Sequence, residues 1–190
     1  MSIGSEKDFL PTEIERVVIT ASRVRRRVRE LAAEITADYQ GRDLYLVTVL
    51  KGGAFFLVDL ARALRIPLSV EFLGITSYGP AARSGAVRLT KDLDEGISGR
   101  HVLIVEDIVD TGLTLSYIYR NLQQRAPASL AICVFLDRPH RRIADLPIAY
   151  RGFEIPDLFV VGYGLDWRQK YRNLPYIASL KPSAYEGAPQ

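Results

Sequence analysis

The sequence predicts an α/β protein with a central parallel sheet that is flanked by helices. Two observations predict this fold class. Short, almost continuously apolar segments alternate with segments of helical periodicity, and apolar strands of this kind are buried on both faces of a parallel sheet. The strand segments are residues 44–50, 69–75, 100–105 and 129–136, and the helical segments between them are residues 54–64 and 113–125.

The length and composition are those of a globular protein. With 190 residues, of which 48% are hydrophobic and 25% charged, the chain fits a single domain. Its formal charge of +3 suits an anionic small molecule and is too weak to indicate nucleic acid. Cys133 lies in an apolar run and is expected to be a core thiol. We expect no signal peptide, no membrane-spanning segment and a cytoplasmic location.

Both ends of the chain depart from this alternation. Residues 12–38 carry a helical pattern, which residues 20–22 could divide into two helices. The arginines within residues 23–29 alternate with apolar residues, which favours a solvated helix face, also open to a second subunit, over a nucleic-acid patch. Residues 76–94 are expected to form a mobile loop or an exposed hairpin.

The last part of the chain is rich in proline and aromatic residues, and it is expected to form a small lobe with one strand at residues 158–161. Fraying is expected after Lys181. The sequence thus predicts one domain over residues 1–190, with a core at about residues 38–138. The lobe would comprise about residues 139–182 together with the N-terminal helical segment.

The stretch V-L-I-V-E-D-I-V-D-T-G-L-T, residues 102–114, places three carboxylates around the end of a strand. Glu106 and Asp107 are expected to end that strand, and residues 111–114 to open the next helix. Ligands of parallel sheets bind beyond the carboxyl ends of the strands. Backbone N–H groups and two hydroxyls at the helix start, with close approach permitted by Gly112, would hold a phosphate. No Lys follows in a G-K-[ST] pattern, which excludes a nucleoside-triphosphate P-loop.

The two adjacent acids indicate a sugar diol beside that phosphate. Carboxylates accept hydrogen bonds from vicinal ribose hydroxyls while a divalent cation offsets their charge. A phosphate at one end and a diol at the other describe a ribose 5-phosphate. Alternatively, Glu106 and Asp107 are solvated residues after a strand and Asp110 is a helix cap. The order of the whole stretch favours the ligand site.

This stretch resembles the phosphoribosyl-pyrophosphate motif of the type I phosphoribosyltransferases. Four further segments are similar to the purine salvage branch of that family, the hypoxanthine-guanine phosphoribosyltransferases, and the resemblance covers about residues 11–181. These segments are V-L-K-G-G (49–53), T-S-Y-G (76–79), G-F-E-I-P-D-L-F-V-V-G-Y-G-L-D (152–166) and Y-R-N-L-P-Y-I (171–177). The acid motif marks the family, and F-V-V-G-Y-G-L-D marks the branch.

The resemblance implies the type I phosphoribosyltransferase fold with a small C-terminal hood. It implies magnesium-dependent transfer of ribose 5-phosphate from phosphoribosyl pyrophosphate to hypoxanthine or guanine, giving IMP or GMP and pyrophosphate, by a homodimer or homotetramer. Glu106 and Asp107 would hold the ribose hydroxyls and, with Asp166, Mg²⁺. Asp110 would act as general base near the purine N7. The ribose 5-phosphate would be bound by Glu106, Asp107, Asp110, Thr111, Gly112, Leu113 and Thr114.

The other segments imply the remaining contacts. Pyrophosphate would be bound by Lys51 and Gly52, in a loop where the family carries a cis peptide, and by Arg172 from the C-terminal segment. Ser77 and Tyr78 would belong to a flexible loop that closes over the site. The purine would be bound by Arg138, Phe159, Val160 and Asp166, with Phe159 stacking on the ring.

Arg138 is a departure from the family, in which a lysine at this place usually donates to the 6-oxo group of the purine. Arginine donates through a planar fork with a different reach. A preference for 6-oxopurines is retained, and the ranking of hypoxanthine, guanine and xanthine is left open.

Two other functions fit parts of the sequence. A regulator could keep the phosphoribosyl pocket and bind nucleotides and RNA without catalysis, but it would not need Asp110. An orotate- or adenine-specific transferase is disfavoured by F-V-V-G-Y-G-L-D. The sequence therefore favours an enzyme that binds neither nucleic acid nor membranes.

Overall fold

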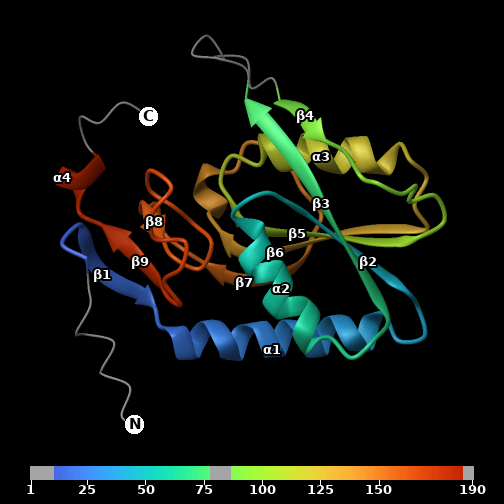
Figure 1. Ribbon diagram of the computed structural model, residues 1–190, viewed down its shortest axis with the longest axis horizontal. Coiled ribbons are helices and arrows are strands. Elements are labelled where there is room, and N and C mark those ends of the chain that lie inside the picture. Colours follow the sequence, from blue (N-terminus) through green and yellow to red (C-terminus); the bar gives the residue numbers. More distant parts are fainter. Residues whose placement is uncertain (1–10, 78–86, 186–190) are drawn as a thin grey trace.

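The computed structural model describes residues 11–77 and 87–185 (Figure 1). Its main sheet consists of β2 (Leu44–Val49), β3 (Leu68–Ser77), β4 (Val87–Lys91), β5 (His101–Val109), β6 (Ser129–Asp137) and β7 (Ile148–Glu154). The strand order is β4-β3-β2-β5-β6-β7. All neighbours are parallel except β4, which pairs antiparallel with β3 at one edge. The predicted fold class is confirmed.

Helices cover both faces of this sheet. One core cluster joins α1 (Ala21–Asp38) and α2 (Gly53–Ala63) to one face, and a second joins α3 (Leu113–Gln123) to the other. The apolar stripe of α1 explains its placement, because Val24, Val28, Leu31 and Ile35 are buried while the arginines between them are exposed or half-buried. The solvated helix face expected for residues 23–29 is confirmed.

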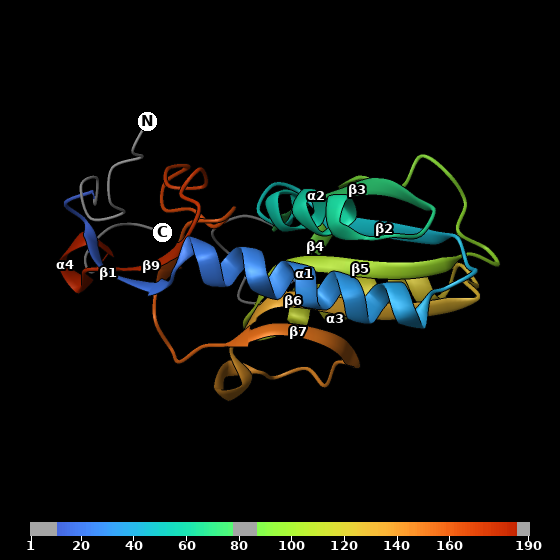
Figure 2. The same ribbon diagram turned by 90° about the horizontal axis from the view of Figure 1, so that it is seen from below.

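A second, three-stranded sheet lies at one end of the molecule in both ribbon views (Figures 1 and 2). It contains β1 (Ile14–Ile19), β9 (Ile177–Leu180) and β8 (Val160–Val161), in the order β1-β9-β8 with antiparallel pairing. The helix predicted over residues 12–38 is therefore wrong in its first part. A break does occur at Thr20, the N-cap of α1, whose side chain accepts a hydrogen bond from the Arg23 N–H at 3.4 Å. The segment before it is a strand because it pairs with β9, far away in the sequence.

The chain beyond residue 139 is more ordered than predicted. β7 joins the main sheet beside β6, and the strand expected at residues 158–161 is limited to β8. The fraying expected after Lys181 is not found in residues 182–185, which form α4 (Pro182–Tyr185). The N–H of Lys181 donates to the Glu13 carbonyl at 2.9 Å, which fixes the chain just before α4.

The elements around the acid stretch also differ slightly from the prediction. β5 continues past the two acids to Val109, because Ile108 and Val109 still pair with β6. Glu106 and Asp107 thus lie within the last four residues of the strand rather than at its end. Within residues 76–94, β4 pairs antiparallel with the end of β3. Of the two alternatives, the hairpin therefore applies to the described residues.

The central strands of the main sheet, β2, β5 and β6, are largely buried. Cys133 has no exposed surface, and burial raises the pKa of its thiol, so the predicted core thiol is confirmed. No helix within the two described ranges is long and apolar enough to cross a membrane.

Candidate active site

The two adjacent acids lie on β5 at the carboxyl edge of the main sheet, beside the loop that joins β2 to α2. The N–H of Val49, at the end of β2, donates to Glu106 Oε1 at 3.1 Å. Asp107 Oδ1 accepts from the Ile108 N–H at 2.7 Å, and its other oxygen points at Gly52. A Cβ on Gly52 would overlap Asp107 Oδ2, so the glycine is what allows the K-G-G turn to approach the carboxylate.

Burial changes the ionisation of both acids. It raises the pKa of Glu106 well above its usual value, and the neighbouring Asp107 adds to this shift. It raises the pKa of Asp107 from 3.8 to about 6. Two carboxylates that are costly to ionise together form a site at which a cation or hydrogen-bond donors would be stabilising.

The predicted phosphate loop connects β5 to α3. Gly112 has a φ of +79°, a left-handed conformation that favours glycine, and it is the N-cap of α3. The N–H of Leu113 lies 3.5 Å from Thr111 Oγ1, and the Ser116 N–H donates to the Gly112 carbonyl at 2.8 Å. A hollow of about 180 Å³ is lined by residues of this loop together with Val49, Ile75, Glu106, Ile108 and Ile118. The loop therefore begins a helix beside the acids, as predicted.

Asp110 faces two arginines rather than solvent alone. Arg141 Nε lies 2.9 Å from Asp110 Oδ1, and Arg138 Nη1 lies 3.7 Å from Oδ2. Arg138 also donates to the Leu158 carbonyl. The sequence indicated Arg138 but not Arg141, whose only signal was its place in the run R-P-H-R-R. The side chain of Asp110 is 37% exposed, so it remains accessible to a ligand.

The pyrophosphate segments come together on the other side of the acids. The peptide bond between Leu50 and Lys51 is cis, as the resemblance implies. Lys51 Nζ donates to Gln169 Oε1 at 3.4 Å. Arg172 lies 2.6 Å from Asp166 Oδ1 and donates to the Gly164 carbonyl at 2.6 Å. Lys51 and Arg172 therefore share the side chain of Gln169, which also accepts from Arg172 at 3.3 Å.

A further hollow, of about 310 Å³, lies under the predicted purine-binding segment. It is lined by Arg138, Arg141, Asp157, Leu158, Phe159, Trp167 and Tyr185. Phe159 stacks on Tyr185 with ring centroids 5.0 Å apart and an interplanar angle of 20°, and Trp167 meets its edge at 5.2 Å. Val160 is buried in β8, so only its backbone could face a ligand. Tyr185 was missed because residues after Lys181 were expected to fray.

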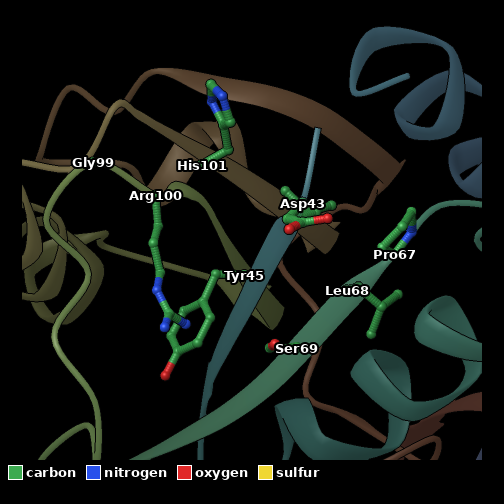
Figure 3. A pocket seen from close by; sticks show the side chains of 9 residues that line it. Asp43, Tyr45, Pro67, Leu68, Ser69, Gly99, Arg100 and His101 are labelled. Carbon is green, nitrogen blue, oxygen red and sulfur yellow. The ribbon is translucent and has the colours of Figure 1, made fainter. Parts of the chain in front are cut away.

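The opposite edge of the main sheet is also hollowed (Figure 3). This cavity, of about 470 Å³, lies at the amino ends of β2, β3 and β5, where Arg100 lies over the Tyr45 ring at 4.9 Å. It is larger than the hollow at the phosphate loop but contains none of the predicted site residues. The carboxyl edge, where acids, glycines and arginines converge, is therefore the candidate active site.

The sequence of this chain matches a known protein-family model that covers the site. The model described as "Phosphoribosyl transferase domain" matches residues 19–168. The chain belongs to the phosphoribosyltransferase family. The matched region contains the acid stretch, the phosphate loop and the predicted purine-binding segment. The fold and family predicted from the sequence are confirmed.

Individual relatives of this phosphoribosyltransferase are similar over nearly their full length. Hypoxanthine-guanine phosphoribosyltransferase of Mycobacterium tuberculosis is 48% identical over 96% of this chain and 94% of its own. The enzyme of the same name from Bacillus subtilis is 45% identical over 92% of this chain and 97% of its own. A crystal structure of hypoxanthine phosphoribosyltransferase from Staphylococcus aureus superposes with a TM-score of 0.87, at 46% identity, over 91% of this chain and 95% of that one.

Phosphoribosyltransferases generally use Mg²⁺, and the carboxylates of this site fit such an ion. Mg²⁺ is usually held by one or two carboxylates together with substrate phosphates and water rather than by a complete protein cage. The described ranges contain no group of three or more His, Cys, Asp or Glu side chains placed to hold a metal. Glu106 and Asp107 offer two carboxylates, whereas Asp166 is paired with Arg172. The predicted three ligands therefore do not form a ready-made cluster.

The predicted loop residues are only partly described. Ser77 ends β3, where it pairs with Val87. Tyr78 lies outside the described residues.

Proposed function

We propose that this enzyme salvages purines by transferring the phosphoribosyl group of phosphoribosyl pyrophosphate to hypoxanthine or guanine. The bond from the sugar C1′ to the purine nitrogen would form as the bond from C1′ to pyrophosphate breaks. The leaving pyrophosphate would take the electron pair, and the products would be IMP or GMP. The observation that carries this proposal is the joint position of the Glu106–Asp107 pair and the Gly112 loop at one sheet edge.

Ribose 5-phosphate would lie across the carboxyl end of β5. Its phosphate would accept hydrogen bonds from backbone N–H groups and hydroxyls of the loop, and the α3 dipole would favour the negative charge. Its 2′ and 3′ hydroxyls would donate to Glu106 and Asp107. The residues of this subsite would be Glu106, Asp107, Asp110, Thr111, Gly112, Leu113 and Thr114.

The diphosphate would replace contacts that the side chains now make with one another. Arg172 would exchange Asp166 for diphosphate oxygens, and Lys51 and Gly52 would offer backbone N–H groups. Mg²⁺ would be held by Glu106, Asp107 and Asp166 with substrate oxygens, and when bound it would offset the charge of the leaving group. Ser77 and Tyr78 would close over the site and exclude water.

The purine would enter the hollow beneath Phe159. Its ring would stack on Phe159, the Val160 backbone would meet its edge, and Arg138 would donate to its 6-oxo group. Asp110 would accept the proton of N7 while the new bond forms. Arg138 and Arg141 would hold the Asp110 carboxylate in place. Arg138 would thus contact both the 6-oxo group of the purine and the general base Asp110.

The remaining features of the proposal concern the whole molecule. We propose a single catalytic domain whose hood includes the three-stranded sheet, a homodimer or homotetramer, and a cytoplasmic location. Its partners would be phosphoribosyl pyrophosphate and a 6-oxopurine, with no nucleic acid and no membrane.

The proposal is tested by mixing the purified protein with phosphoribosyl pyrophosphate and Mg²⁺ and measuring nucleotide formation with five bases in parallel. These bases are hypoxanthine, guanine, xanthine, adenine and uracil. We expect product with hypoxanthine or guanine and none with uracil. If no base gives product although the protein binds the sugar diphosphate, the site holds its ligand without transforming it and the proposal fails.

A further inference from the structure

Another buried carboxylate stands behind the phosphate loop and has no role in the reaction above. Asp137, the last residue of β6, has no exposed surface. Arg142 donates a hydrogen bond to its Oδ1, and Arg151 Nε lies 2.7 Å from its Oδ2. Burying a carboxylate costs free energy even when it is paired. Apolar residues in place of a buried ion pair often stabilise a core equally well or better. Its position therefore calls for a reason besides stability.

Arg142 connects this carboxylate to the phosphate loop. A Cβ on Gly112 would lie 3.2 Å from Arg142 Cδ, so the aliphatic stem of Arg142 packs against the glycine at the start of α3. The next two residues are tied to the same loop, because the N–H groups of Ile143 and Ala144 donate to the Thr111 carbonyl at 2.9 and 3.1 Å. The guanidinium turns the other way, to Asp137. The segment that backs the loop is thus anchored through Arg142.

Arg151 pairs with the other oxygen of the same carboxylate. It belongs to β7, and its guanidinium also lies 2.6 Å from Glu154 Oε1. Its described ion pairs are with Asp137 and Glu154, and neither residue is part of the loop. The two arginines therefore neutralise one buried charge, but Arg142 alone of this pair leads to the phosphate loop.

We propose that Asp137 is a positioning residue for phosphoribosyl binding, acting through Arg142. The ion pair fixes residues 142–146 against the back of the loop, and this keeps the backbone donors of the loop aimed at the 5′-phosphate. The inference rests on the proposed function, since it assigns the phosphate of phosphoribosyl pyrophosphate to this loop. Asp137 would then contribute to the affinity for the sugar phosphate although it contacts neither substrate.

The test compares Arg142→Met with Arg151→Met. Both remove one guanidinium from Asp137 and keep an unbranched side chain, so both should lower Tm. We expect only Arg142→Met to raise KM for phosphoribosyl pyrophosphate and Kd for ribose 5-phosphate, each roughly tenfold, because a displaced binding group weakens the contacts it positions. KM for hypoxanthine should stay unchanged in both variants. Equal effects of the two variants on ribose 5-phosphate, or no effect despite lower Tm values, would overturn the inference.

Calorimetric titration with ribose 5-phosphate separates this inference from the proposed function. If the wild-type protein binds ribose 5-phosphate but forms no nucleotide, the function fails while the comparison of Kd values still decides the role of Asp137. Arg142→Lys and Arg151→Lys provide a milder pair if either Met variant does not fold. Lysine retains the charge without the fork, so Arg142→Lys should recover part of the affinity. An Arg142→Lys affinity equal to that of Arg151→Lys, with both at the wild-type value, would contradict the positioning role.

Discussion

The two halves of the active site are built in different ways. The phosphate loop on the main sheet is shaped by backbone: a glycine at φ +79°, the start of α3, and N–H groups of residues 143 and 144 that hold the Thr111 carbonyl. The half toward the three-stranded sheet is built from side chains that pair with one another. Arg141 binds Asp110 and Arg172 binds Asp166.

This difference indicates which substrate groups bind with a small loss of conformational entropy and few broken ion pairs. A loop whose backbone is already in place loses little freedom when a phosphate arrives. In the other half, each ion pair has to be exchanged for contacts with the diphosphate or the purine, and the charges concerned are partly desolvated. We therefore expect substitutions in the side-chain half to change turnover and base selection while sugar-phosphate binding persists.

Asp110→Asn should show the largest separation between the two halves. The amide keeps the shape of the carboxylate but does not accept a proton, so turnover should fall by at least about 100-fold, the usual size of a general-base contribution. Calorimetry should give a Kd for ribose 5-phosphate close to that of the wild type. Unchanged turnover would remove Asp110 as the base, and lost ribose 5-phosphate binding would show that the two halves are not independent.

The acid pair should make the metal-free protein less stable as the pH rises. Asp107 has a pKa of about 6 in the folded protein and near 3.8 when unfolded, so the folded state binds the proton more tightly. The stabilisation from protonated Asp107 is full below about pH 3.8 and is lost as the pH rises through about 6. In EDTA, Asp107→Asn should therefore raise Tm at pH 7.5 by several degrees, since each kcal/mol shifts Tm by about 2–4 °C in a chain of this size.

The same substitution should have a smaller effect on Tm near pH 4.5 and almost none near pH 3.5, because the wild-type carboxyl is protonated in the folded protein at both values and becomes largely protonated in the unfolded chain only at the lower one. Comparing the two proteins at each pH removes contributions from other groups. Mg²⁺ should raise Tm of the wild type at pH 7.5 and have less effect on Asp107→Asn. A pH-independent difference between the proteins would contradict the raised pKa of Asp107.

Arg138→Lys should have a smaller effect, confined to the choice of base. Arg138 is 12% exposed and reaches both Asp110 and the Leu158 carbonyl, so its fork is held in the hollow. Lysine would present a single point charge, and the ratio of kcat/KM for hypoxanthine and guanine should shift several-fold. Arg141→Lys is the matched control, because it contacts the same carboxylate and should alter both bases equally. An unshifted ratio would mean that Arg138 does not touch the ring.

Sequence patterns predicted the secondary structure of the backbone half well. The run of apolar residues into Glu106 and Asp107, followed by T-G-L-T, is a local signal whose strand, turn and helix are all contiguous. Gly112 was interpreted from the sequence as a residue that permits close backbone approach, and the structure adds its left-handed φ of +79°. The alternation of strands and helices likewise predicted the main sheet.

The side-chain half depends on contacts that no local pattern contains. β1 resembles the start of a helix until it pairs with β9, more than 150 residues away, and β8 consists of only two residues. Arg141 reaches Asp110 across two elements, and Tyr185 reaches Phe159 from the far end of the chain. Apart from Asp110, which belongs to the acid stretch, only the family resemblance indicated residues in this half, and it did not extend to Arg141 or Tyr185.

Tyr185→Ala should produce the smallest change, limited to the base. The stacked pair of Tyr185 and Phe159 fixes the ring on which the purine would stack, and an aromatic pair of this kind contributes about 0.5–1.5 kcal/mol. Removing it should raise KM for hypoxanthine roughly threefold, since 1.4 kcal/mol corresponds to about tenfold. KM for phosphoribosyl pyrophosphate should not change, and Tyr185→Phe should behave as the wild type because it keeps the ring. If Tyr185→Ala raised both KM values equally, α4 would support the whole site, and the two halves would not be separable at the three-stranded sheet.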